Sequence, residues 1–135
     1  MPSDRIYAKA CFVSWALFLA WSGFVFQGAV LPSNKIPLFL LHMNDKIVHG
    51  LSYLILFGTA LFAFKNTRWI FLRVSPEKSA LVYCAVMGIV TEISQIFVPG
   101  RVCDAADWTA DVLGAVLGLF LYRRLIHKEK KHEIL

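Results

Sequence analysis

The chain has 135 residues, of which 58% are hydrophobic and only 17% are charged. Its mean hydropathy is +0.61, and this apolar share exceeds that of an average soluble domain. Its length corresponds to a single domain. The formal net charge of +5 could serve nucleic-acid binding, but the placement of the basic residues, described below, argues against nucleic acid as a partner.

Four apolar stretches follow one another along the chain, over residues 10–31, 47–64, 79–98 and 105–122. A helix needs roughly 20 residues to cross the hydrocarbon core of a bilayer, and each stretch comes close to that length. The sequence therefore predicts an all-α fold, in which residues 1–135 form one integral membrane four-helix bundle.

The basic residues predict the orientation of this bundle. They gather before the first stretch, between the second and third, and after the fourth, where residues 123–135 form a basic tail. Only Lys35, Lys46 and Arg101 lie in the other two loops. Because Lys and Arg accumulate in cytoplasmic loops, we expect a multi-pass protein of the plasma or inner membrane. Both termini and the basic tail would then be cytoplasmic, and the loops at 32–46 and 99–104 would face outward.

The second stretch begins with a polar group of residues. Asn44 is a suitable N-cap, and Asp45 and His49 are four residues apart, so they share a helix face. A carboxylate can orient an imidazole by accepting its N–H, which raises the basicity of the other ring nitrogen. His49 is a candidate acid or base, although a satisfied structural hydrogen bond is the commoner explanation of a lone His. Lys46 is either a substrate ligand or a membrane anchor.

The third stretch ends with Glu92 and Gln95, three residues apart. A carboxylate near a helix C-terminus is disfavoured by the helix dipole and by lipid. Glu92 must therefore be neutralised, paired or bound to a ligand. We expect its partner to be Arg101, Lys46 or His49.

The segment after Pro99 combines one cation with three acids. Arg101 presents a planar fork of donors suited to carboxylate or phosphate. Asp104 and Asp107 have the spacing of an N-cap and an N3 residue, so helix capping explains part of their presence. Asp111 lies one turn deeper, on the same face, where capping cannot reach it. Small residues such as Gly114 continue this stripe and favour close helix packing.

In the predicted topology these residues all lie near the outward-facing ends of their helices. We expect Glu92, His49 and Asp107 to be the candidate catalytic residues. The candidate substrate-binding residues are Asp45, Lys46, Gln95, Arg101, Asp104 and Asp111. The cytoplasmic ends carry almost only basic residues, and this asymmetry is the main physical argument for a site.

The combined motif resembles the VanZ-like family of small membrane proteins. The resemblance covers residues 44–118 and rests on Asp45-Lys46-x-x-His49, Glu92-x-x-Gln95 and Pro99-x-Arg101 with Asp104, Asp107 and Gly114. It implies a multi-span cell-envelope protein, since the namesake of the family is associated with resistance to the glycopeptide teicoplanin. Asp111 departs from the family pattern, which typically has Asn there, and the extra carboxylate either changes the charge of the site or is held protonated.

Three function classes follow from this reading. The first is an envelope factor that binds a lipid-linked cell-wall precursor or glycolipid, with cations on phosphate and acids on sugar hydroxyls or an amine. The second is an enzyme that acts on such a lipid by acid/base chemistry. The third is a non-catalytic scaffold.

Cofactors and partners are less defined by the sequence. No cofactor is expected from the motifs, but Glu92, Asp107 and Asp111 are an alternative set of ligands for a divalent cation. The expected partner is a membrane lipid or lipid-linked precursor and not nucleic acid. A homo-oligomer or another membrane protein remains open as a further partner.

Overall fold

A computed structural model describes residues 2–36 and 44–133, with side chains over 5–36 and 44–126. The described residues form helices and no strand. The elements are α1 (Pro2–Val30), the short 3-10 helix η1 (Ser33–Lys35), α3 (Asp45–Lys65), α4 (Ile70–Val74), α5 (Pro76–Gln95) and α6 (Ala105–Glu133). The predicted all-α class is thus confirmed, and each of the four apolar stretches lies mainly on one long helix.

The helix starts follow from local sequence. Asn44 caps α3, since its side-chain oxygen accepts the Lys46 N–H at 3.0 Å. Pro76 begins α5, where its fixed φ suits the first helical position and its missing N–H costs no hydrogen bond. Ser75 precedes it but makes no side-chain capping bond. The proline therefore starts α5 without a side-chain cap from Ser75.

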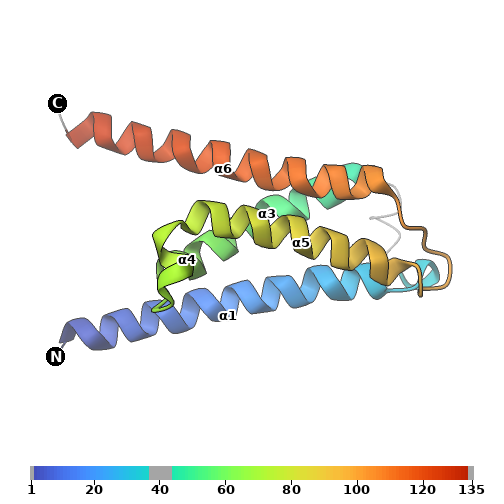
Figure 1. Cartoon of the computed structure of the whole chain (residues 1–135), viewed down its shortest axis with the longest axis horizontal. Helices are drawn as coiled ribbons and strands as arrows, with labels where there is room; N and C mark the ends of the chain where they lie inside the picture. The colour runs from blue at the N-terminus through green and yellow to red at the C-terminus, as the bar shows by residue number, and fades with distance from the viewer. Residues whose placement is uncertain (1, 37–43, 134–135) are drawn as a thin grey trace.

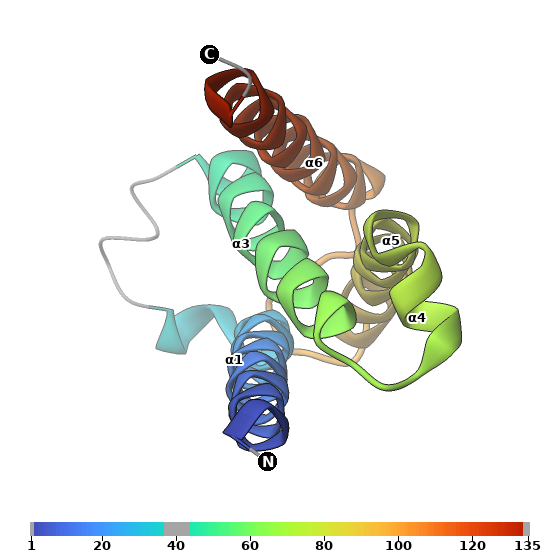
Figure 2. The ribbon, with the colours of Figure 1, turned by 90° about the vertical axis from the view of Figure 1, so that its left-hand side faces the viewer.

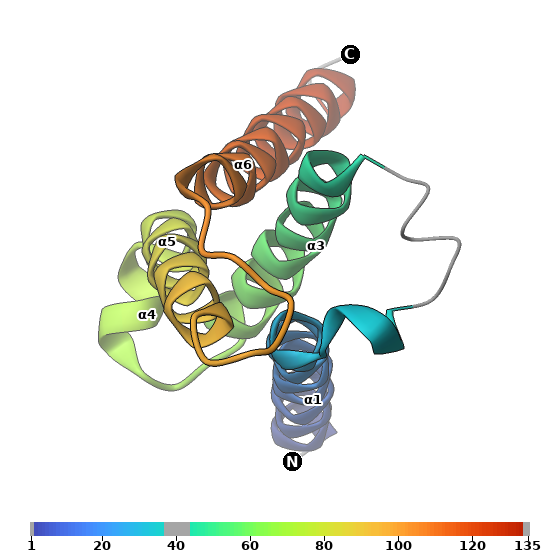
Figure 3. The same ribbon diagram turned by 90° about the vertical axis from the view of Figure 1, so that its right-hand side faces the viewer.

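Helix α3 lies at the centre of the fold. It packs against α1, α5 and α6, and the two end views show it between α1 on one side and α5 and α6 on the other (Figures 2 and 3). Its core face carries the fully buried Leu56, Phe57 and Ala60. Phe18 of α1 joins this core and packs edge-on against Phe64 of α3, with ring centroids 5.4 Å apart.

Helices α3 and α6 come very close together at Gly50 and Gly114. A Cβ atom added to Gly114 would overlap the Gly50 backbone and lie only 2.9 Å from the Gly50 Cα. Only glycine permits two helix backbones to come so near. The small-residue stripe of α6 therefore serves close packing, as its sequence predicted.

Large apolar side chains remain exposed along all four long helices. They include Phe12, Phe24, Val86, Ile89 and Leu113. Exposed apolar surface of this extent is rare on monomeric soluble proteins and marks a surface that something apolar covers. A lipid bilayer would cover this surface, since two of the helices have the length and composition of membrane spans.

Those two helices are α1, over Arg5–Val30, and α3. In the part of the chain that the structure describes, α5 and α6 are not counted among the helices that are long and apolar enough to cross a membrane. Glu92 near the end of α5 and Asp107 and Asp111 at the start of α6 lower the hydropathy of these helices. Four membrane spans, and hence a four-helix membrane bundle, therefore stay a prediction, as does the cytoplasmic location of the termini.

The start of α1 and the end of α6 lie at the same end of the molecule but on opposite sides of it (Figure 1). At the opposite end α1 finishes, α3 begins, and a loop joins α5 to α6 (Figure 1). Residues 37–43 of the loop between α1 and α3 lie outside the described residues. The polar residues that the sequence singled out belong to this second end.

The glycine contact gives a direct prediction about stability. Gly114→Ala should destabilise the protein by about 1–3 kcal/mol, because the added methyl group meets backbone that cannot move aside. Thermal unfolding of the detergent-solubilised protein measures the loss. Gly23→Ala is the matched control, since a Cβ at Gly23 meets nothing within 4 Å and should leave the protein equally or slightly more stable. Equal unfolding temperatures for both variants would contradict the role of the contact.

Candidate functional site

Lys46 links the start of α3 to the start of α6. Its Nζ lies 2.9 Å from Asp104 Oδ2 and also donates to Asp107 Oδ1. Lys46 and Asp104 are about half exposed, whereas Asp107 is almost fully buried. Lys46 is therefore neither free nor paired with Glu92, but it keeps one of its three donors for a further ligand.

Asp104 is the N-cap of α6. Its Oδ1 accepts the Ala106 N–H at 2.8 Å, and its carbonyl accepts the Asp107 N–H at 2.9 Å. Hydrogen bonding to Lys46 and then to the Ala106 N–H holds the pKa of Asp104 below its usual value. The capping role predicted for Asp104 is confirmed, whereas Asp107 makes its ion pair to Lys46 in place of a capping bond.

Glu92 binds the chain immediately before α6. Its Oε2 accepts the Asp104 N–H at 2.8 Å. In a capping box, the acid at position N3 accepts this same N–H of the N-cap residue. The expected pairings of Glu92 with Arg101 and with Lys46 are wrong in this structure. Both cations lie nearer other acceptors. The Glu92 side chain is buried, with 4% of its surface exposed.

Arg101 fastens the α5–α6 loop to the end of α1. Its Nη2 donates to the Gly28 carbonyl at 2.9 Å and its Nε donates to the Leu31 carbonyl at 3.2 Å. These carbonyls belong to the last turn and end of α1, where a cation is favoured by the helix dipole. Gly100 supports the same junction, with a φ of 77° that favours glycine and a hydrogen bond from Ser33 Oγ to its carbonyl.

His49 is paired with Asp111 of α6 and not with Asp45. Its Nδ1 lies 2.9 Å from Asp111 Oδ1, whereas Asp45 is exposed at the start of α3. The glycine contact explains this choice, because His49 is adjacent to Gly50 and Asp111 lies one turn before Gly114. Sequence spacing within one helix predicted the wrong acid, since it could not show the crossing of a second helix.

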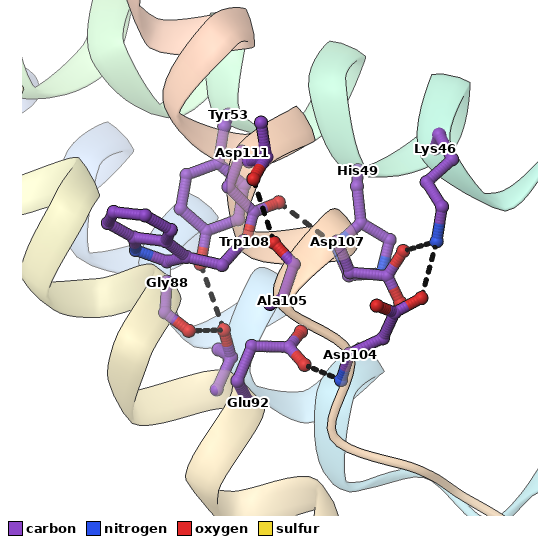
Figure 4. Close-up of polar contacts among 12 residues, drawn as sticks. Lys46, His49, Tyr53, Gly88, Glu92, Asp104, Ala105, Asp107, Trp108 and Asp111 are labelled. Carbon is purple, nitrogen blue, oxygen red and sulfur yellow. Dashed lines mark hydrogen bonds and ion pairs between the residues drawn. The ribbon is translucent and has the colours of Figure 1, made fainter.

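The buried polar layer also contains Tyr53 and Thr91, and the exposed Trp108 lies next to it; sequence reasoning gave none of the three a role in the site. The Tyr53 hydroxyl lies 3.1 Å from Thr91 Oγ1, which donates to the Gly88 carbonyl. Trp108 Nε1 donates to the Ala85 carbonyl at 3.1 Å. Tyr53 follows His49 by one turn, and Trp108 follows Asp107 directly, so polar aromatics beside candidate site residues were the available signal. Figure 4 shows how α3, α5 and α6 each contribute to this layer.

A cavity of about 690 Å³ opens beside this layer. One wall is polar and is formed mainly by residues that the sequence identified, namely Asp45, Lys46, His49, Gln95, Arg101, Asp104 and Asp107. The apolar part of the lining comes mainly from the end of α1, with Phe24, Val25, Gly28 and Ala29, and from Leu31 directly after it. Glu92 and Asp111 do not line the cavity and lie behind its polar wall. The sequence gave no sign of the apolar wall, because its residues look like ordinary lipid-facing positions.

Two sets of side chains in the described part of the chain could hold a metal ion. They are Asp45, His49 and Asp107, and His49, Glu92 and Asp111; in each set the ligand atoms lie within 4.8 Å of one another. The alternative set expected from sequence combined Glu92, Asp107 and Asp111. His49 belongs to both sets that the structure brings together.

Comparison with known proteins places the chain in a family. The family model described as VanZ/LLP1 matches residues 6–127. The chain belongs to the VanZ/LLP1 family. The match extends beyond the motif region of 44–118, since it also covers most of α1. No curated protein and no solved structure matches the chain. Family membership, the two apolar helices and the exposed apolar surface together indicate a membrane protein.

The two bonds of Asp104 can be separated by substitution. Asp104→Asn keeps the cap but loses the charge that pairs with Lys46, whereas Asp104→Ala loses both. We expect unfolding temperatures at pH 7 in the order wild type, Asp104→Asn, Asp104→Ala. The folded protein lowers the pKa of Asp104. The difference in stability between the wild type and Asp104→Asn should therefore be constant above about pH 4, and it should vanish as the pH falls below the pKa of Asp104 in the folded protein. Identical unfolding temperatures for Asn and Ala would contradict the capping role.

Proposed function

We propose that this protein is a cell-envelope membrane protein that binds the head group of a lipid-linked cell-wall precursor or glycolipid. The observation that carries the proposal is the mixed lining of the cavity, which combines charged residues of α3, α6 and the loop before α6 with apolar residues at the end of α1. An amphiphile presents the same combination of a polar head and an apolar chain. A ligand pocket of this size and mixed lining is typical of small-molecule sites.

The polar wall offers groups for each part of such a head group. Arg101 uses only some of its five N–H donors on α1, and Lys46 keeps one donor, so both can still contact a phosphate. The Gln95 amide can donate to and accept from sugar hydroxyls, and the carboxylates can accept from hydroxyls or from an amine. Three acids, Asp45, Asp104 and Asp107, line the cavity with the two cations, so the site favours a ligand that carries hydroxyl groups or an amine beside its phosphate.

The charge distribution orients the proposed site. The basic loops and tail lie at the end of the molecule that holds both termini, and the cavity lies at the other end. By the preference of Lys and Arg for the cytoplasm, the termini would be inside and the cavity would open outward. A precursor exposed on the outer side of the membrane could then reach it.

A purely structural role fits the buried layer less well. In a scaffold cluster the buried polar atoms are expected to satisfy one another. Here one oxygen of Glu92 and one of Asp111 have no hydrogen-bond partner among the described residues. Such groups cost stability, and their retention supports a role toward a ligand.

A blocked cavity tests the binding function. Gly28→Phe places a ring at the apolar wall, whereas Gly23→Phe puts the same ring on α1 outside the cavity; a Cβ at either position meets nothing within 4 Å. In nanodiscs, binding of a polyprenyl-diphosphate-linked disaccharide-peptide should weaken at least tenfold in Gly28→Phe and stay at wild-type affinity in Gly23→Phe. Equal affinity in wild type and Gly28→Phe would refute the cavity as the binding site.

An enzyme acting on the same lipid is the second candidate, and the His49–Asp111 pair favours it. A buried carboxylate that holds one imidazole nitrogen leaves the other free for general acid or base chemistry, and His49 lines the cavity. Mass spectrometry of the lipid after incubation distinguishes the two candidates. An enzyme should form a product that His49→Gln lowers at least 100-fold, whereas a binding protein should return the lipid unchanged.

A further inference from the structure

Two buried carboxylates lie close together behind the polar lining of the cavity, and each has one oxygen without a hydrogen-bond partner. Glu92 is 4% exposed and Asp111 is 0% exposed. In the described part of the chain, Glu92 Oε1 and Asp111 Oδ2 lack any hydrogen-bond partner. Burying a carboxylate oxygen without a partner is costly, because water no longer solvates it. An occupant that accepts electron pairs from oxygen would remove this cost.

The basic side chains around the site do not supply that occupant. Lys46 is engaged by Asp104 and Asp107, and Arg101 is engaged by the carbonyls at the end of α1. Of the positively chargeable groups whose side chains the structure describes, only His49 forms an ion pair with either buried carboxylate. Two carboxylates with a neutral imidazole carry a charge of −2, which one divalent cation would neutralise.

The three groups also have the arrangement of a ligand set. His49 comes from α3, Glu92 from α5 and Asp111 from α6, and one ligand atom from each lies within 4.8 Å of the others. The labelled side chains of Figure 4 show these groups converging from three helices. Small rotations of the carboxylates would bring the ligand atoms to the roughly 3.4 Å separation that follows from tetrahedral bonds of about 2.1 Å.

We propose that His49, Glu92 and Asp111 form a binding site for one divalent transition-metal ion, with Zn²⁺ as the best-matched probe. An imidazole nitrogen with two carboxylate oxygens suits zinc and its neighbours, whereas Mg²⁺ and Ca²⁺ prefer oxygen ligands alone. The other candidate set of metal ligands, Asp45, His49 and Asp107, is less suited to bind a cation. Lys46 already neutralises Asp107, and Asp45 is exposed.

Three protein ligands leave a position of the ion open, as in catalytic rather than structural zinc sites. His49 forms part of the cavity wall, so the open position would lie next to the cavity. The site goes beyond the proposed function, because it would bind the ion whether or not the cavity accepts a lipid. An ion there would give that cavity a Lewis-acidic group for a phosphate or carbonyl oxygen.

Metal binding is tested on the full chain in nanodiscs, without added lipid-linked ligand. After chelation and dialysis, isothermal titration with Zn²⁺ should give about one ion per chain, and the unfolding temperature should rise with Zn²⁺ concentration. Glu92→Gln and Asp111→Asn should each weaken Zn²⁺ binding at least 100-fold. Glu77→Gln makes the same chemical change at the other end of α5 and should leave Zn²⁺ binding intact.

Further arms separate the site from its alternatives. Mg²⁺ should not compete with equimolar Zn²⁺, and Asp45→Asn should keep wild-type affinity. The proposal is overturned if the folded wild type takes up no Zn²⁺, if Mg²⁺ binds equally well, or if Asp45→Asn abolishes binding while Glu92→Gln does not. Where a variant fails to fold, the nitrogen NMR resonances of His49 in the wild type still report the site, since a bound Zn²⁺ must shift them. Lipid binding measured in chelator reads out the proposed function separately.

Discussion

The contact between Gly50 and Gly114 is the constraint on which the site depends. It lets α3 and α6 approach until their backbones touch, and close approach of this kind is possible only without side chains. His49 is adjacent to one glycine and Asp111 lies one turn from the other, so the contact also fixes the imidazole beside its carboxylate. A larger separation of the two helices would leave both groups buried and without each other.

The charges of the site are arranged by depth. The cations lie at the rim, where Lys46 pairs with the acids that begin α6 and Arg101 holds the last carbonyls of α1. The unsatisfied acids lie behind them, away from solvent. This arrangement gives each cation a structural task and leaves the negative charge of Glu92 and Asp111 for a ligand. Rigid placement by three helices, with a second layer of Tyr53 and Thr91, is what a preorganised site requires.

Sequence reasoning succeeded where a residue interacts with its own neighbourhood. Asn44 and Asp104 cap helices as their types and positions predicted. Sequence reasoning failed to predict hydrogen-bond and ion-pair partners that lie far apart in the sequence. Asp111 took the place of Asp45 beside His49, and backbone carbonyls took the place of Glu92 beside Arg101. Asp45 and His49 do share a helix face, but a crossing helix brought a better-placed acid to the imidazole.

By itself, the sequence determined the helical class, the family and the end of the bundle at which the ionisable residues collect. These properties follow from hydropathy and motif spacing, which are local in the chain. Only the tertiary structure decided which acid meets which base, that two carboxylate oxygens stay without a partner, and that α1 supplies an apolar wall to the cavity. Such pairings depend on how closely and at what register helices pack, and no single segment carries that information.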